Sequence, residues 1–179
     1  MSDRPLNATA ASLLGFLHER PMTGWDLVAT AQALIGDFWS LTRSQVYREL
    51  TAMERDGLIR AGAVGARDKR PYELTDAGRA AFAAWIAHEP GPENIRYPLL
   101  LTLAFGRHLS PERLATFLAR HRQVHAARLE GYEALRAGDG LDLYARATLD
   151  FGVRYERAVL DWFDHLPPEL TAPAGTKEP

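Results

Sequence analysis

The sequence predicts a mainly α-helical protein with one small β-hairpin in its 179 residues. Apolar residues recur with helical spacing over most of the chain, and residues that cap or end helices separate these segments. One stretch, residues 58–74, instead has the pattern of two short strands joined by an exposed turn. A segment with two prolines and a glycine, residues 89–96, then divides the chain into two parts.

Clear start and stop residues separate the first two predicted helices. Asn7 can cap the first helix, which Pro21 ends. Thr23 and Asp26 resemble a capping box, with Asp in place of the usual Glu, and open a second helix that we expect to end near Ile35.

The third predicted helix is well marked at both ends. Thr42 and Gln45 have the spacing of a capping box. The helix should end near Asp56, because Gly57 stands where a left-handed residue closes a helix. Leu58 can make the apolar contact that accompanies such a closure.

A hairpin and a fourth helix should follow. We expect a strand over residues 58–64, an exposed turn over residues 65–70 and a short return strand over residues 72–74. Thr75 can cap the fourth helix, which should extend to about His88.

Helices also dominate the second part of the chain. We expect an apolar helix near residues 98–106. Ser110 and Pro111 form a strong start for a long helix that ends near Ala137, and the last helix should cover residues 141–166.

These elements suggest two folded domains. The prediction is a first domain over residues 1–88, a linker over residues 89–96, a helical region over residues 97–170 and a disordered tail over residues 171–179. Three helices are few for a self-sufficient core, so we expect a second copy of the chain to cover the apolar stripes of residues 97–170, which makes this the dimerisation region.

Composition excludes several classes of protein. The chain has no cysteine, which excludes disulfides, thiol catalysis and cysteine-based zinc sites. It has no apolar run of about 18 residues and no export signal, so we expect a cytoplasmic protein without a membrane helix. The net charge is −2, but residues 43–70 hold seven basic and four acidic side chains. Any surface of this protein that binds nucleic acid would therefore have to be a local basic patch.

No pattern of side chains indicates an enzyme, a metal or a cofactor. His121 and His125 have a metal-compatible spacing but no third ligand nearby, so we expect a polar helix face. Asp161, Asp164 and His165 should act only in solvation and helix-end electrostatics. A nucleophile elbow and phosphate-binding glycine loops are missing from the sequence.

The third helix provides the functional prediction. Val46, Leu50 and Met53 form one apolar stripe. The opposite side presents hydroxyl, aromatic and guanidinium groups at Ser44, Tyr47, Arg48, Thr51 and Arg55. By itself this is also the pattern of an ordinary amphipathic helix with a solvated face. The basic hairpin tip that follows favours a winged helix-turn-helix, in which the third helix enters the major groove of double-stranded DNA.

We therefore predict two groups of DNA contacts. Groove contacts are expected from Ser44, Tyr47, Arg48 and Thr51. Phosphate contacts are expected from the helix start at Thr42 and Arg43 and from the wing residues Arg67, Lys69 and Arg70.

Several ordered motifs resemble the PadR family of bacterial transcriptional regulators. They are PMTGWDL at residues 21–27, FWSLTRSQVYREL at residues 38–50, MERDGLI at residues 53–59 and YELTDAG at residues 72–78. Trp25 replaces the usual tyrosine of the first motif. Pro71 stands where the family usually has an aromatic residue, and we expect it to make the return strand short or to place it at an edge of the sheet.

The resemblance implies a homodimer that binds a roughly palindromic operator, usually as a repressor. It also implies a small aromatic effector. Residues that could line an effector pocket are Trp39, Trp85, Phe151 and Trp162, for which core packing is the alternative.

A second reading of the sequence stays open. The first 88 residues carry ten basic and ten acidic side chains. This balance leaves room for the alternative of a winged-helix module that binds another protein, or senses a ligand, without touching DNA. Salt dependence distinguishes the two readings, because binding to DNA releases counterions.

Overall fold

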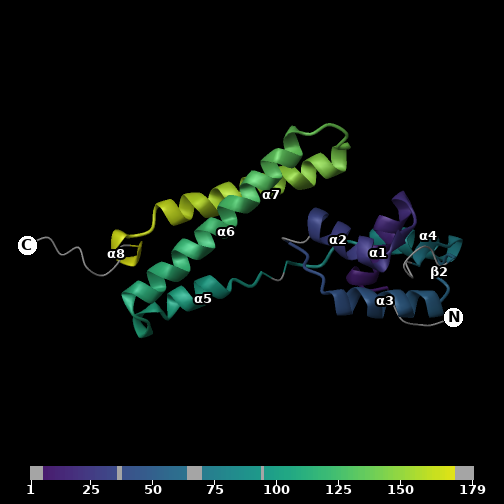
Figure 1. Ribbon diagram of the computed structural model, residues 1–179, viewed down its shortest axis with the longest axis horizontal. Helices are drawn as coiled ribbons and strands as arrows, with labels where there is room; N and C mark the ends of the chain where they lie inside the picture. Colours follow the sequence, from purple (N-terminus) through teal and green to yellow (C-terminus); the bar gives the residue numbers. More distant parts are fainter. Residues whose placement is uncertain (1–5, 36–37, 64–69, 94, 172–179) are drawn as a thin grey trace, which may run out of the picture. The chain divides into compact units, whose positions relative to one another are not determined.

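A computed structural model describes residues 6–35, 38–63, 70–93 and 95–171 of the chain. It is mainly helical with one small antiparallel sheet, as the sequence predicts (Figure 1). The chain forms two compact units, Met1–Pro92 and Glu93–Pro179. Each unit has its own apolar cluster.

Three capped helices open the first unit: α1 (Ala8–Glu19), α2 (Gly24–Leu34) and α3 (Arg43–Arg55). Their predicted caps are confirmed. The backbone N–H groups of Ala10, Asp26 and Gln45 donate to the side chains of Asn7, Thr23 and Thr42, respectively. Thr23 and Thr42 both form complete capping boxes.

A left-handed glycine ends α3, as predicted. Gly57 has a φ of 73°, and its N–H donates to the Glu54 carbonyl at 3.1 Å. The N–H of Leu58 donates to the Met53 carbonyl at 2.9 Å. These two bonds satisfy carbonyls that the last turn of a helix leaves open, and they send the chain directly into the sheet.

The sheet has three antiparallel strands in the order β1-β3-β2. They are β1 (Met22–Thr23), β2 (Ile59–Ala61) and β3 (Pro71–Leu74). The hairpin β2–β3 is confirmed, although β2 is shorter than expected. The strand β1 was not predicted, because two residues cannot show an alternating pattern.

The first of the two alternatives expected for Pro71, a short return strand, is the one found. β3 is short, but it is the central strand rather than an edge strand. Pro71 is the first residue of β3, a position at which proline is tolerated. It pairs with Thr23, and its carbonyl accepts the N–H of Gly62 at 2.8 Å. Because proline has no backbone N–H, Pro71 accepts a hydrogen bond in the hairpin but cannot donate one.

The helix α4 (Asp76–Ile86) begins directly against the base of the hairpin. The Thr75 hydroxyl lies 2.9 Å from the Leu58 carbonyl and accepts the N–H of Gly78 at 3.0 Å. A Cβ atom on Gly78 would lie only 2.0 Å from the Leu58 carbonyl oxygen. The start of α4 and the hairpin are therefore locked together.

One apolar cluster holds this unit together. Its fully buried members come from α1, α2, α3 and β2 and include Leu13, Leu14, Leu27, Val46, Leu50 and Ile59. Phe82 of α4 and Tyr72 of β3 pack against its margin. The cluster covers one face of α3 and leaves the other to solvent.

The second unit is built on two long antiparallel helices, α6 (Pro111–Ala137) and α7 (Leu143–Asp164) (Figure 1). They approach closely at Gly152, where a Cβ atom would lie 2.9 Å from the Tyr132 ring. α7 begins two residues later than expected, because Asp142 caps it by accepting the N–H of Ala145 at 2.7 Å.

Shorter helices complete this unit. They are α5 (Pro98–Ala104), the 3-10 turn η2 (Gly106–His108) and α8 (Pro168–Thr171). α8 was not predicted, because Pro168 was read only as a stop, whereas proline also suits a first helical turn. The apolar cluster here is small, with Leu99, Leu114, Leu118 and Phe163 as its buried members.

The expected polar helix face at the histidine pair is wrong for one of the two residues. His121 is exposed, but His125 is buried, and its Nδ1 lies 2.5 Å from Oε2 of the buried Glu156. The partner comes from α7, 31 residues away, so nothing local in the sequence could show it.

The cluster at the end of α7 has the expected electrostatic character. Asp164 accepts a hydrogen bond from Arg122 of α6 at 2.9 Å. The exposed His165 is hydrogen-bonded to the Asp161 carbonyl, which raises its pKa, and the Asp161 carboxylate adds to the shift.

Replacing Gly78 with alanine should destabilise the first unit. The new methyl group would press on the Leu58 carbonyl, and overpacking of this kind costs about 1–3 kcal/mol or more. Urea denaturation followed by circular dichroism measures the loss. Gly91→Ala is the matched control, because nothing lies within 4 Å of its added Cβ atom. Equal midpoints for the two variants would contradict this account of the α4–hairpin contact.

Candidate nucleic-acid interface

The two faces of α3 differ as the sequence predicts. Val46, Leu50 and Met53 are fully buried in the apolar cluster. Glu49 is also buried, beside this stripe. Such burial fixes the rotation of α3 about its own axis, so the residues on its opposite side must face solvent.

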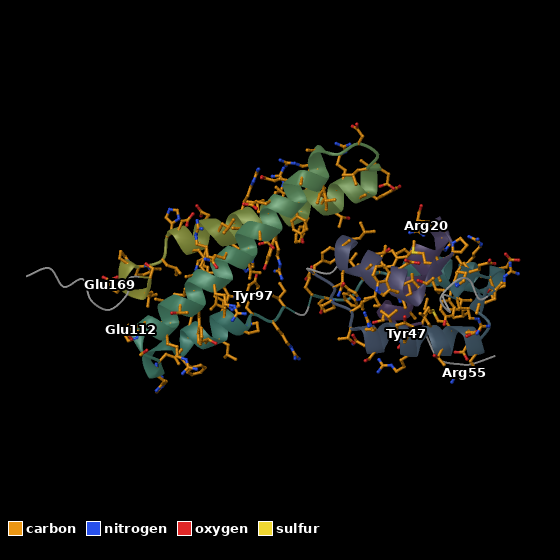
Figure 2. The ribbon with its side chains drawn as sticks, viewed as in Figure 1. Arg20, Tyr47, Arg55, Tyr97, Glu112 and Glu169 are labelled. Atoms are coloured by element: carbon orange, nitrogen blue, oxygen red, sulfur yellow. The ribbon has the colours of Figure 1, made fainter. Side chains whose placement is uncertain are left out.

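The opposite face carries the predicted contact residues. Thr42, Arg43, Ser44, Tyr47, Arg48 and Thr51 are all exposed. They occupy the helix start and its first two and a half turns. Figure 2 labels Tyr47 and Arg55 on this helix, with Arg55 at its C-terminal end. The structure thus brings these six residues onto one surface.

Tyr47 is held in place by the start of α2. A Cβ atom on Gly24 would lie 2.7 Å from Cε1 and 3.1 Å from the hydroxyl oxygen of Tyr47. Only a glycine lets the ring pass this close. The role of Gly24 was not predicted, because its only signal in the sequence is its place in the PMTGWDL motif. The Tyr47 ring therefore lies directly against the backbone at the start of α2.

The hydroxyl groups on this face are partly engaged. The Thr42 hydroxyl donates to Oε1 of Gln45 in the capping box, at 2.9 Å. By helix geometry, the N–H groups of Arg43 and Ser44 in the first turn have no partner within the helix. The Thr51 hydroxyl donates to the Tyr47 carbonyl at 3.0 Å and keeps its acceptor capacity.

The positive charge is strongest toward the start of α3. Among the residues that the structure describes, no carboxylate lies within ion-pair distance of Arg43. The Arg48 guanidinium lies 3.8 Å from the buried Glu49. At the other end, Arg55 is hydrogen-bonded to Asp56 at 3.1 Å, which raises the pKa of Arg55. A phosphate would meet more uncompensated charge at the helix start.

The wing can be followed only at its base. Arg67 and Lys69 lie outside the described residues. Arg70 is exposed, and its guanidinium lies 3.5 Å from Glu54 of α3. Burial and the nearby Glu54 raise the pKa of Tyr72, and Arg70 opposes that shift. The base of the wing is therefore linked to α3 by charge as well as by the sheet.

The four candidate effector residues are divided between the two units. Trp39 and Trp85 belong to the first unit, and Phe151 and Trp162 belong to the second. Trp162 packs edge-on against Phe163 at 4.7 Å between ring centroids, which is the core-packing alternative. Phe151 is 65% exposed and stacks on Tyr155. A shallow pocket beside Glu49 contains none of the four.

Within the part of the chain that the structure describes, every helix is too short or too polar to cross a membrane. The same residues contain no group of three or more His, Asp or Glu side chains that could hold a metal ion.

Comparisons with known proteins cover both units. The model of the Transcriptional regulator PadR-like family matches residues 13–84, and that of the Virulence activator alpha C-term family matches residues 95–171. The chain is 31% identical over 176 residues to the probable transcriptional regulator Rv1176c of Mycobacterium tuberculosis (strain ATCC 25618 / H37Rv), covering 87% of this chain and 93% of that protein. It is also 31% identical over 134 residues to the negative transcriptional regulator PadR of Bacillus subtilis (strain 168), covering 70% and 74%.

Solved structures share the fold over nearly the whole chain. The Vibrio cholerae virulence activator AphA aligns with a TM-score of 0.68 at 26% identity, covering 91% of this chain and 96% of AphA. Bacillus subtilis PadR in complex with operator DNA aligns with a TM-score of 0.72 at 23% identity, covering 90% and 96%. The same protein in complex with p-coumaric acid aligns with a TM-score of 0.65 at 25% identity, covering 88% and 95%.

The winged-helix unit and the helical unit therefore each match a regulator family, and one relative spans both. The chain belongs to the PadR-like family of transcriptional regulators, which are not enzymes.

Proposed function

We propose that this protein is a cytoplasmic repressor that binds a roughly palindromic DNA operator as a homodimer. The observation that carries the proposal is the exposed face of α3, where Arg43, Ser44, Tyr47, Arg48 and Thr51 project from a helix whose other face is fully buried. A relative at 31% identity is named as a negative regulator, which supports repression.

Base contacts and phosphate contacts would come from different parts of this surface. Ser44, Tyr47, Arg48 and Thr51 offer the donors and acceptors that read base edges in a major groove. At the helix start, the Arg43 guanidinium and the backbone N–H groups of Arg43 and Ser44 would bind phosphates. Thr42 would contribute by capping the helix, because its N–H and hydroxyl already donate to Gln45. The flanking backbone would be met by the wing residues Arg67, Lys69 and Arg70.

Uncovered apolar side chains in the second unit support the homodimer. Leu101 on α5, and Leu143, Tyr144 and Phe151 on α7, are all more than 60% exposed in the single chain. A second copy of the chain that covered these side chains would remove their apolar surface from water. In a dimer, two α3 helices would enter successive major grooves about 34–36 Å apart and block access to the operator.

A small aromatic acid is the proposed class of effector. The related PadR was solved with p-coumaric acid, an aromatic carboxylate. Of the four candidate residues, Trp39 and Phe151 are the exposed ones, so they have ring surface to offer a ligand. Trp85 and Trp162 are half-buried, which leaves less of each ring accessible.

Binding to DNA can be tested directly by fluorescence anisotropy. The probes are the DNA upstream of the protein's own gene and a scrambled duplex, each at two salt concentrations. We expect tighter binding to the upstream DNA, weakened strongly by salt because each phosphate contact releases a counterion. No binding to either duplex at low salt would overturn the proposal in favour of a protein-interaction module.

Replacing Arg48 with alanine should weaken binding to the operator by about 1–3 kcal/mol if the guanidinium reads a base. Binding to the scrambled duplex should change little. The two anisotropy titrations give this comparison in one experiment. An equal loss on both duplexes would instead assign Arg48 to a phosphate.

Replacing Gly24 with alanine should weaken operator binding by about 1 kcal/mol or more, because the Tyr47 ring must move from its place on a base edge. Stability should hardly fall, because the neighbouring atoms belong to the movable end of a side chain. The control is a double-mutant cycle in which Gly24→Ala has no further effect once Tyr47→Ala is present. Additive losses would show that Gly24 acts independently of Tyr47.

A further inference from the structure

A large aromatic side chain lies exposed at the start of α2. Trp25 is 56% exposed and is the second residue of this helix, directly after Gly24. It is not among the side chains that form or border the apolar cluster of the first unit. Burial in the core therefore does not account for an indole ring at this position. Single exposed apolar side chains are common, so the surroundings of Trp25 must show whether it has a role.

Two contacts place Trp25 between the exposed face of α3 and the wing. On one side, a Cβ atom on the preceding Gly24 would lie 2.7 Å from Cε1 of the Tyr47 ring. On the other side, Thr23 pairs with Pro71 at the base of the wing, in an antiparallel register. The start of α2 is therefore adjacent to both surfaces that we propose to contact DNA.

This position determines which part of a duplex Trp25 can reach. With the recognition helix in the major groove, the preceding helix of a helix-turn-helix crosses the sugar–phosphate backbone. Here that preceding helix is α2, and Trp25 is the large exposed side chain of its first turn. The indole ring would thus lie over the DNA strand between α3 and the wing, and not over base edges.

The charge at the start of α2 does not favour a phosphate. The Asp26 carboxylate accepts hydrogen bonds from the Thr23 N–H at 3.1 Å and from the Thr23 hydroxyl at 2.8 Å. Its negative charge offsets the positive end of the helix dipole, which would otherwise attract an anion. We therefore expect the contact with the DNA strand at this point to be apolar and to involve the deoxyribose rings.

We propose that the Trp25 indole packs against deoxyribose rings of the strand between α3 and the wing, and that it holds the protein on DNA without reading sequence. This inference rests on the proposed function. Sugar contacts carry no sequence information, so the loss of the ring should weaken binding to every duplex equally. An apolar contact releases no counterion, so the salt dependence of binding should stay the same.

The same helix offers a matched control. Leu34 is 58% exposed and is the last residue of α2. It lies about 13 Å from Trp25 along the helix axis and about two and a half turns further on, so it is on the opposite side of the helix. Leu34→Ala removes an exposed apolar side chain from α2 but leaves the start of this helix intact.

Fluorescence anisotropy of the full chain tests the proposal, with the upstream duplex and the scrambled duplex at three or more salt concentrations. We expect Trp25→Ala to weaken binding to both duplexes by the same factor, about fivefold to tenfold, because an aromatic ring covers a large apolar area. The slope of log affinity against log salt concentration should match that of the wild-type protein.

Two further variants and a folding check complete this experiment. Trp25→Tyr should retain most of the affinity, because it keeps an aromatic ring at the same place. Leu34→Ala should bind both duplexes as the wild-type protein does. Circular dichroism and size-exclusion chromatography check that each variant folds and assembles normally, and Trp25→Gln carries the test if Trp25→Ala does not fold.

Four results would overturn the proposal while the proposed function stands. They are wild-type affinity of Trp25→Ala for both duplexes, an equal loss in Leu34→Ala, a loss confined to the upstream duplex, and a shallower salt slope. The third result would assign Trp25 to base edges or to the support of Tyr47, and the fourth would show that phosphate contacts were lost instead. A wild-type protein that binds neither duplex overturns the proposed function, and this inference with it.

Discussion

Burial of the apolar stripe on α3 is the constraint on which the rest of the first unit depends. Val46, Leu50 and Met53 enter a core formed with α1, α2 and β2. A helix that buries one stripe must present the opposite one, so the face on which Arg43, Tyr47 and the other polar residues lie follows from hydrophobic packing. Burial of apolar side chains in the core thereby determines which polar side chains of α3 face solvent.

The contacts that follow α3 in the chain fix the position of the hairpin relative to this helix. The chain leaves α3 through Gly57, pairs as β2 and β3, and is then locked by Thr75 and Gly78 against the Leu58 carbonyl. The ion pair between Arg70 and Glu54 adds a link from the wing base back to α3. α3 and the base of the wing are therefore connected through the Gly57 closure, the hairpin and this ion pair.

Local signals predicted most of the fold. Caps at Asn7, Thr23 and Thr42 and the closure at Gly57 are written in adjacent residues, and both were found as expected. The strand β1 and the burial of His125 depend on partners far away in the chain, so no local pattern could reveal them. In the candidate interface, helical periodicity predicted which face of α3 is exposed. The contact between Gly24 and Tyr47 could not be predicted, because the two residues are brought together only by the fold.

Two of the arginines near the hairpin that the structure describes form ion pairs within the protein. Arg55 pairs with Asp56, and Arg60 pairs across the hairpin with Glu73 at 2.7 Å. Every cation paired internally is one fewer to hold the protein on arbitrary chromosomal DNA, which offers about 10⁶–10⁹ competing sites. Internal pairing of these arginines therefore lowers the share of sequence-independent phosphate attraction in any binding to DNA.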